Sequence, residues 1–241
     1  MTTAAAKSFE PETLLIPAGE FSMGCDQGAA CERPAHRVNL DPFRIGKYAV
    51  TNAQYRQFIE DANYAIPPSW SDPRFTHPDQ PVTSVSWYDA MAYCDWLTKR
   101  SQNIYSLPTE AEWERAARGG VEGRLYTWGN QPPEGQTGYH ESWISSPEPV
   151  GRRPASEFGL YDISENVHEW CCDWFDPDYY SSSPPRNPRG PATGSRKASR
   201  GGSWRHQVKI ARVAARSSIP PDYRYNDYGF RVVVTVNPES G

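Results

Sequence analysis

The sequence predicts a mixed α+β fold with little regular secondary structure, built from three short helices and irregular antiparallel sheets. Three segments begin with helix-capping signatures, and both ends of the chain alternate apolar and polar residues as strands do. The 241 residues include 23 Pro, 18 Gly, 9 Trp and 14 Tyr, and only 37% are apolar. This composition is typical of a fold in which aromatic packing holds much irregular backbone together.

Strands are expected near both ends of the chain. Residues 13–24 (TLLIPAGEFSMG) contain a Pro-Ala-Gly turn, and residues 36–50 (HRVNLDPFRIGKYAV) alternate in polarity. A final strand is expected over residues 226–236 (NDYGFRVVVTV). These segments supply the sheets of the predicted fold.

Each predicted helix begins with a residue pair that satisfies the free amides of its first turn. The capping pairs are Thr51–Gln54, Ser86–Asp89 and Thr109–Glu112. The helices follow over residues 51–63, 86–100 and 109–118, and Gly119 and Gly120 end the third. In the second helix, one face carries Ala90, Tyr93, Cys94 and Leu97 at helical spacing, which predicts a core-facing stripe.

No linker or internal repeat divides the chain, so we expect a single domain over residues 13–236. Residues 1–12 and 237–241 are then short tails. Residues 124–154 and 175–200 show no sustained periodicity and are expected to be loops with short strands. Long segments of this kind inside a compact domain are usually functional or held by specific contacts.

No membrane segment is expected. The chain has no apolar run of membrane-spanning length, and its first 15 residues do not resemble a signal peptide. We therefore expect a cytoplasmic protein. In that reducing compartment the five cysteines (25, 31, 94, 171 and 172) are expected to be free thiols, although Cys25 and Cys31 are close enough in sequence to pair if oxidised.

The net charge of −4 is unevenly distributed. Residues 179–221 contain nine Lys or Arg and no Asp or Glu, so the rest of the chain is acidic. Such a basic, proline-rich segment indicates either an anionic ligand or docking of the segment onto the acidic body, and both interpretations stay open here. Nucleic acid is disfavoured as a partner because the acidic remainder would repel it.

Eight sequence blocks, occurring in order, connect the chain to a known family. They are IPAGEFSMG (16–24), VTNAQYRQF (50–58), PVTSVSWYDAMAYCDWL (81–97), SLPTEAEWERAARGG (106–120), YTWGN (126–130), FGLYDISENVHEW (158–170), RGGSW (200–204) and NDYGFRVV (226–233). Together they resemble the formylglycine-generating enzyme (sulfatase-modifying factor) family from about residue 13 to 236. The resemblance implies a C-type-lectin-like core stabilised by bound calcium.

The enzyme of this family binds copper through two cysteines shortly after its Gly-Gly-Ser motif and activates oxygen against a substrate cysteine. In this sequence His206 stands at the first position, the second falls near Lys209 or Ile210, and no cysteine follows Cys172. Because Cu(I) prefers thiolate ligands, the sequence argues against copper and against formylglycine generation. Ser203 matches a family active-site serine, but a serine alone supplies no redox chemistry.

The segment YDISENVHE (161–169) resembles one calcium site of the family. The resemblance implies that Asp162 and Glu169 bind Ca²⁺ through side-chain oxygens and that Glu165 and Val167 offer backbone carbonyls. Oxygen-only ligation from a curved loop suits this hard cation. The alternative is that Asp162 and Glu169 only face solvent.

The chain is also similar to the variable proteins of diversity-generating retroelements, which share the frame from RGGSW to GFRV. In those proteins the residues between the two motifs form a ligand-binding face. The corresponding residues here are Ser203, Trp204, Arg205, His206, Gln207, Lys209, Tyr223, Tyr225, Asn226 and Tyr228. Tyrosine supplies contact area at low entropic cost, and arginine supplies directional hydrogen bonds. The alternative is that the tyrosine-rich segment is packed structure.

The sequence therefore predicts a non-catalytic binding domain whose face, residues 203–209 and 223–228, recognises an unidentified protein or an anionic, carboxylate-bearing ligand. An oxidoreductase of the same superfamily with a different reaction is the alternative, and a metal or cofactor near His206 would favour it. A third alternative is a regulatory partner subunit of an active paralogue, which predicts a large hydrophobic patch.

Overall fold

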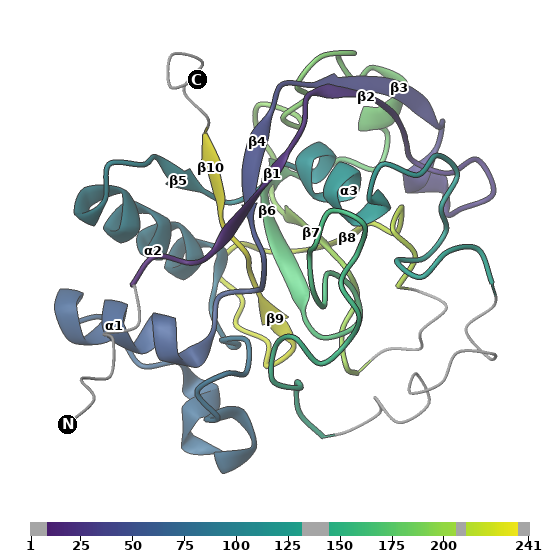
Figure 1. The fold of residues 1–241 in the computed structure, drawn as a ribbon. Coiled ribbons are helices and arrows are strands. Elements are labelled where there is room, and N and C mark those ends of the chain that lie inside the picture. Colours follow the sequence, from purple (N-terminus) through teal and green to yellow (C-terminus); the bar gives the residue numbers. More distant parts are fainter. Residues whose placement is uncertain (1–8, 132–144, 206–210, 236–241) are drawn as a thin grey trace.

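A computed structural model describes residues 9–131, 145–205 and 211–235 (Figure 1). The α-helices are α1 (Asn52–Ala62), α2 (Trp87–Arg100) and α3 (Glu110–Arg118). Short 3-10 helices are η1 (Ala30–Glu32), η2 (Pro68–Ser71), η3 (Pro73–Phe75) and η5 (Tyr179–Ser181). The strands are β1 (Thr13–Ile16), β2 (Gly19–Met23), β3 (His36–Leu40), β4 (Phe43–Gly46), β5 (Tyr105–Ser106), β6 (His168–Trp174), β7 (Lys197–Arg200), β8 (Ser217–Ile219), β9 (Tyr228–Gly229) and β10 (Val233–Thr235). The predicted α+β class is confirmed.

The described strands form three sheets. The first has the order β1-β4-β10-β5, and β2 pairs with β3 in a two-stranded sheet. The third has the order β8-β7-β6-β9. Neighbouring strands are antiparallel except β6 and β9, which run parallel.

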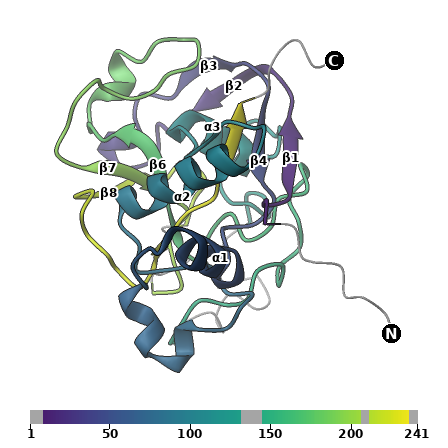
Figure 2. The same cartoon turned by 90° about the vertical axis from the view of Figure 1, so that its left-hand side faces the viewer.

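The first sheet separates two apolar cores, with α3 beside one face and α1 and α2 beside the other (Figures 1 and 2). Neighbouring residues of β10 point to opposite cores, as expected for a strand. Val233 belongs to the core that contains Trp113 of α3, and Val234 to the core that contains Tyr93 of α2. The second core is strongly aromatic, with the Tyr55 and Tyr93 rings stacked 5.7 Å apart.

All three capping predictions are confirmed. In each helix the Thr or Ser side chain accepts from the third backbone amide, and the side chain of that third residue accepts from the cap's own amide. Helix α3 ends at Gly119 in the left-handed conformation (φ +64°), which favours glycine. The predicted stripe of α2 is buried.

The C-terminal segment predicted as one strand forms two strands in different sheets. β9 lies beside β6 in the third sheet, and β10 lies between β4 and β5 in the first. Between them Arg231 points inward and donates to both carboxylate oxygens of Glu169 (2.6 and 2.7 Å). The single-strand prediction was wrong because a long-range ion pair interrupts the strand, and no local pattern signals such a pair.

The longest described strand, β6, follows no alternating pattern and was not predicted. Trp170 and Cys171 are both fully buried although they point to opposite faces. A strand buried on both sides shows no period-2 signal.

Three buried or partly buried arginines of the basic segment (residues 179–221) pair with buried carboxylates of the acidic body. The pairs are Arg200 with Glu110 and Glu114, Arg216 with Glu110, and Arg212 with Glu32. Arg200 is completely buried. For these residues the structure shows docking onto the body, one of the two interpretations that the sequence left open.

No helix within the described ranges is both long enough and apolar enough to cross a membrane.

Candidate functional site

Two glycines lead the chain from β7 into the predicted binding face. Gly201 and Gly202 have φ values of +95° and +67°, and a Cβ on Gly201 would lie 3.0 Å from the carbonyl oxygen of Ile163. The turn places Ser203 in the interior with 3% of its surface exposed. Its Oγ donates to Oδ2 of Asp227 at 2.9 Å.

The Asp227 carboxylate forms the polar centre of this face. Nη1 of Arg205 lies 3.7 Å from Oδ1 of Asp227 and donates to Oδ1 of Asn226 at 3.2 Å. Asp227 is buried, whereas 48% of the Arg205 side chain is exposed. Sequence reasoning missed Asp227, although it lies between two residues that were selected, Asn226 and Tyr228.

Aromatic residues form the rim of the face. Tyr223 and Tyr225 are exposed, and their rings meet edge to face at 5.7 Å. Trp204 is partly buried and packs against Phe75, with ring centroids 6.1 Å apart. Together with Arg205 these side chains give the face the composition of a protein-binding surface.

Tyr228 is not on this surface, contrary to the prediction. Its hydroxyl accepts from Ser199, its ring stacks on His168 at 4.6 Å, and 5% of the residue is exposed. Burial in the third sheet also raises the pKa of Tyr228. Tyr228 therefore supports the face from beneath.

His206, Gln207 and Lys209 lie outside the described residues, so their places in the face remain predictions.

The described groups around Ser203 are a hydroxyl, a carboxylate, an amide and a guanidinium. These groups exchange hydrogen bonds and bind charged ligands, but they supply no thiolate for Cu(I). Within the described ranges, no three His, Cys, Asp or Glu side chains are arranged to hold a metal ion.

Both predicted calcium-binding carboxylates are engaged by protein donors. Asp162 Oδ2 accepts from the Gly151 amide at 2.5 Å, and burial raises the pKa of Asp162. Glu169 is fully buried and, besides its ion pair with Arg231, accepts from Nε1 of Trp113 at 2.7 Å. Arg231 therefore already compensates the charge of Glu169. Of the two predicted side-chain ligands, Asp162 is the one that accepts from a backbone amide and, within the described ranges, has no ion pair.

Glu165, in the same loop, combines backbone strain with an unsatisfied side chain. Its φ is +76°, in the region that favours glycine, and neither buried carboxylate oxygen has a hydrogen-bond partner. Its nearest described cation is Arg153, with Nη1 3.5 Å from Oε2. Burial raises the pKa of Glu165 to about 8. A cation in this loop would offset the free-energy cost of burying the Glu165 carboxylate without hydrogen-bond partners. Calcium at residues 162–169 therefore fits the loop in part and stays a prediction.

The three short helices, irregular sheets and glycine turn before Ser203 define a C-type-lectin-like fold of the formylglycine-generating type. Residues 1–236 match the model of the sulfatase-modifying factor enzyme 1-like domain (FGE-sulfatase), and the chain belongs to this family.

Its relatives include an enzyme and a variable protein. The chain is 35% identical to the formylglycine-generating enzyme of Streptomyces coelicolor, over 94% of this chain and 90% of that one. Among solved structures it is similar to PvdO from Pseudomonas aeruginosa (27% identity, TM-score 0.78, 95% of both chains). It is equally similar to Treponema denticola variable protein 1 (25% identity, TM-score 0.79, 92% of this chain and 94% of that one).

Proposed function

We propose that this chain is a binding domain of the formylglycine-generating enzyme family and that it does not generate formylglycine. The observation that carries the proposal is the chemistry after the Gly-Gly-Ser motif. Ser203 is committed to a hydrogen bond with Asp227, and no cysteine follows Cys172 in the chain. Without thiolates near this position, copper-dependent oxidation of a cysteine has no metal site.

The geometry of the face supports binding. Arg205 is held on one side by Asn226 and Asp227, so less entropy is lost when its exposed edge contacts a ligand. Tyr223 and Tyr225 add rigid contact area beside it. The similarity to a variable protein of the same fold agrees with this use of the surface.

The proposed partner is a protein that presents a carboxylate to Arg205. Arg200, Arg212 and Arg216 are already neutralised by the protein's own carboxylates, so the basic segment offers little diffuse attraction for a polyanion. The half-exposed guanidinium of Arg205 is instead suited to recognise a single carboxylate of the partner.

An oxidoreductase with another reaction is the second candidate. It is favoured by the 35% identity to an enzyme over nearly the whole chain, which exceeds the identity to the variable protein.

One experiment tests the claim that the chain does not generate formylglycine. The purified protein is incubated with a sulfatase peptide that contains the substrate cysteine, with and without copper, while oxygen uptake, peptide mass and bound metal are measured. The Streptomyces coelicolor enzyme is the positive control. We expect no oxygen uptake and no change in peptide mass. Turnover with bound copper or iron would refute the binding-only proposal.

The binding face is tested by comparing two variants in affinity capture. Arg205→Ala removes the half-exposed cation, whereas Tyr88→Ala changes an exposed side chain of α2 outside the face. We expect a captured partner to be lost with Arg205→Ala and kept with Tyr88→Ala. Equal capture by both variants would place the partner elsewhere.

A further inference from the structure

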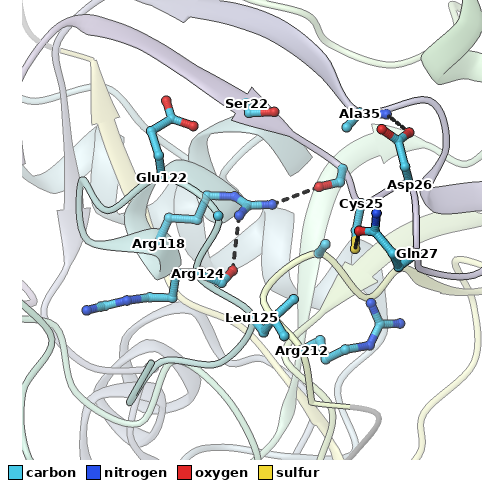
Figure 3. A pocket seen from close by; sticks show the side chains of 13 residues that line it. Ser22, Cys25, Asp26, Gln27, Ala35, Arg118, Glu122, Arg124, Leu125 and Arg212 are labelled. Atoms are coloured by element: carbon cyan, nitrogen blue, oxygen red, sulfur yellow. Dashed lines mark hydrogen bonds between the residues drawn. The ribbon is translucent and has the colours of Figure 1, made fainter. Parts of the chain in front are cut away.

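A cavity of about 260 Å³ lies away from the residues of the proposed binding face (Figure 3). Its walls come from the end of β2 and the loop after it, the end of α3, residues 122–125, and the segment that begins at Arg212. Ligand pockets commonly measure about 300–1,000 Å³, so this cavity suits a small molecule.

The back wall of the cavity is fixed by hydrogen bonds between distant segments. The Gly24 amide donates to Glu114 (2.8 Å), and its carbonyl accepts from Arg118 (2.9 Å). Arg118 also donates to the carbonyl of Arg124 (3.1 Å), as Figure 3 shows. Gly24 has φ +89°, and a Cβ there would lie 2.5 Å from the Glu32 carbonyl oxygen. The cavity is therefore preformed, and the charge of Arg118 is committed to its wall.

Two other charged groups of the lining keep unused bonding capacity. Arg212 pairs with Glu32 through Nη1 and Nη2 (both 2.7 Å), which leaves the Nε–H edge of the guanidinium. Asp26 accepts one backbone amide through Oδ1, from Ala35 at 2.8 Å, which leaves Oδ2. Figure 3 shows Asp26 and Arg212 at the two ends of one wall, with Cys25 and Gln27 between them.

The signs of these charges restrict the ligand. An anion at the Nε–H edge of Arg212 meets Asp26 and Glu122 in the same lining, as well as Glu32, which already compensates the charge of this guanidinium. A simple cation at Asp26 meets a lining that also contains the guanidinium groups of Arg118, Arg124 and Arg212. A molecule with one charge of each sign satisfies both ends of the wall. Leu125 and Ala214 provide apolar surface for a short hydrocarbon chain between its two charges.

We propose that this cavity binds a small zwitterion of the ω-amino acid type, with its ammonium group at Asp26 and its carboxylate at Arg212. Because Cys25 and Gln27 separate the two protein charges, a ligand with several methylene groups between its own charges fits better than glycine. The site is independent of the proposed binding function, since no lining residue belongs to that face.

Calorimetric titration with a homologous series tests the proposal. The probes are glycine, β-alanine, 4-aminobutanoate, 5-aminopentanoate and 6-aminohexanoate, each compared with the alkylamine and the alkanoate of the same length. We expect an optimum beyond glycine and at least about tenfold weaker binding when either charge is missing, since a charge-assisted bond contributes about that factor. No binding at 10 mM, or equal binding of the singly charged probes, would overturn the proposal.

A matched pair of variants assigns the ammonium end. Asp26→Asn keeps the oxygen that accepts from Ala35 and removes the charge, while Asp41→Asn makes the same change at an exposed carboxylate outside the cavity. We expect about tenfold weaker binding for Asp26→Asn and unchanged binding for Asp41→Asn. Equal affinities for the two variants would contradict the assignment.

Thiol protection gives a readout that does not depend on heat signals. Cys25 and Cys31 are both partly exposed, but only Cys25 lines the cavity. Bound 6-aminohexanoate is expected to slow alkylation of Cys25 by iodoacetamide and to leave Cys31 unchanged, as followed by peptide mass spectrometry. Parallel protection of both thiols would argue for a general conformational effect and against this site.

Discussion

Single residues show how this protein stabilises charge in its interior. Arg231 and Glu169 are both fully buried, and the pair joins the C-terminal segment to β6. A buried ion pair adds little compared with an apolar replacement of both partners, but removing one partner leaves a costly lone charge. Arg231, between β9 and β10, therefore matters for stability through the charge that it compensates.

Replacing Arg231 with Met is expected to destabilise the protein by about 3–5 kcal/mol, because Glu169 is left as an uncompensated buried carboxylate. Guanidinium denaturation measures the change. The control is Arg186→Met at the exposed pair with Asp41, where we expect a loss below about 1 kcal/mol. Similar losses for the two variants would show that burial does not set the cost.

Asp173 predicts a pH dependence of stability. Burial, followed by the nearby charge of Glu110, raises the pKa of Asp173 from its ordinary value to about 7. The folded state thus binds this proton more tightly than the unfolded state does. The contribution of protonated Asp173 to the free energy of unfolding is therefore largest below about pH 4 and is lost as the pH rises to about 7.

Asp173→Asn removes this titration and keeps an oxygen that accepts from the Glu110 amide. We expect the stability of the variant relative to the parent protein to increase from pH 5 to pH 8, by an amount on the order of a few kcal/mol. Denaturation curves at both pH values give the difference. A pH-independent difference would mean that Asp173 keeps an ordinary pKa.

The residues of the binding face could be predicted only in part from the sequence. Arg205, Tyr223 and Tyr225 were selected by type and position, and the structure places them at the surface. The inward direction of Tyr228 depends on its parallel pairing with His168 across 60 residues, and the role of Asp227 depends on Ser203. Long-range pairing of this kind leaves no local signal in one sequence.

Secondary-structure elements were predictable where their determinants are local. Each capping box lies within four consecutive residues, so its chemistry can be read directly from the sequence. β6 is determined instead by two neighbouring strands and by burial on both faces. The split between β9 and β10 likewise depends on Glu169, which is distant in sequence.

The loop over residues 162–169 is the element whose stability we expect to respond to calcium. Asp162 is buried with a positive φ, and Glu165 has two carboxylate oxygens without hydrogen-bond partners. After treatment with a chelator, Ca²⁺ at 100 times its dissociation constant should add about 2.7 kcal/mol to the free energy of unfolding. Thermal and chemical denaturation measure the gain.

Asp162→Ala is expected to abolish the calcium effect, while Asp41→Ala at the surface keeps it. Mg²⁺ serves as a second control, because it requires a smaller and more regular site. If Ca²⁺ changes the stability of neither the parent protein nor the variants, the Arg231–Glu169 pair and the backbone amides suffice to hold the loop.

At the scale of the whole molecule, the acidic body and the basic segment neutralise each other within the fold. Helix α3 supplies Glu110 and Glu114, and the basic segment supplies Arg200 and Arg216. Charge asymmetry along a sequence therefore does not establish charge asymmetry of the surface. The sequence alone could not decide whether the basic segment binds an anionic ligand or docks onto the acidic body, because the same residues are compatible with either arrangement.

This internal compensation predicts weak binding to polyanions. A chain with nine Lys or Arg and no acidic residue between 179 and 221 would bind heparin or DNA if that segment were free. With Arg200, Arg212 and Arg216 paired inside the fold and a net charge of −4, we expect elution from heparin below about 0.15 M salt, where exposed charges are already screened over about 8 Å. A synthetic peptide of residues 179–221 is the control and should elute at higher salt. If the folded protein and the peptide elute together, the basic segment is accessible in solution, and the anionic partner that its composition indicates returns as the better explanation.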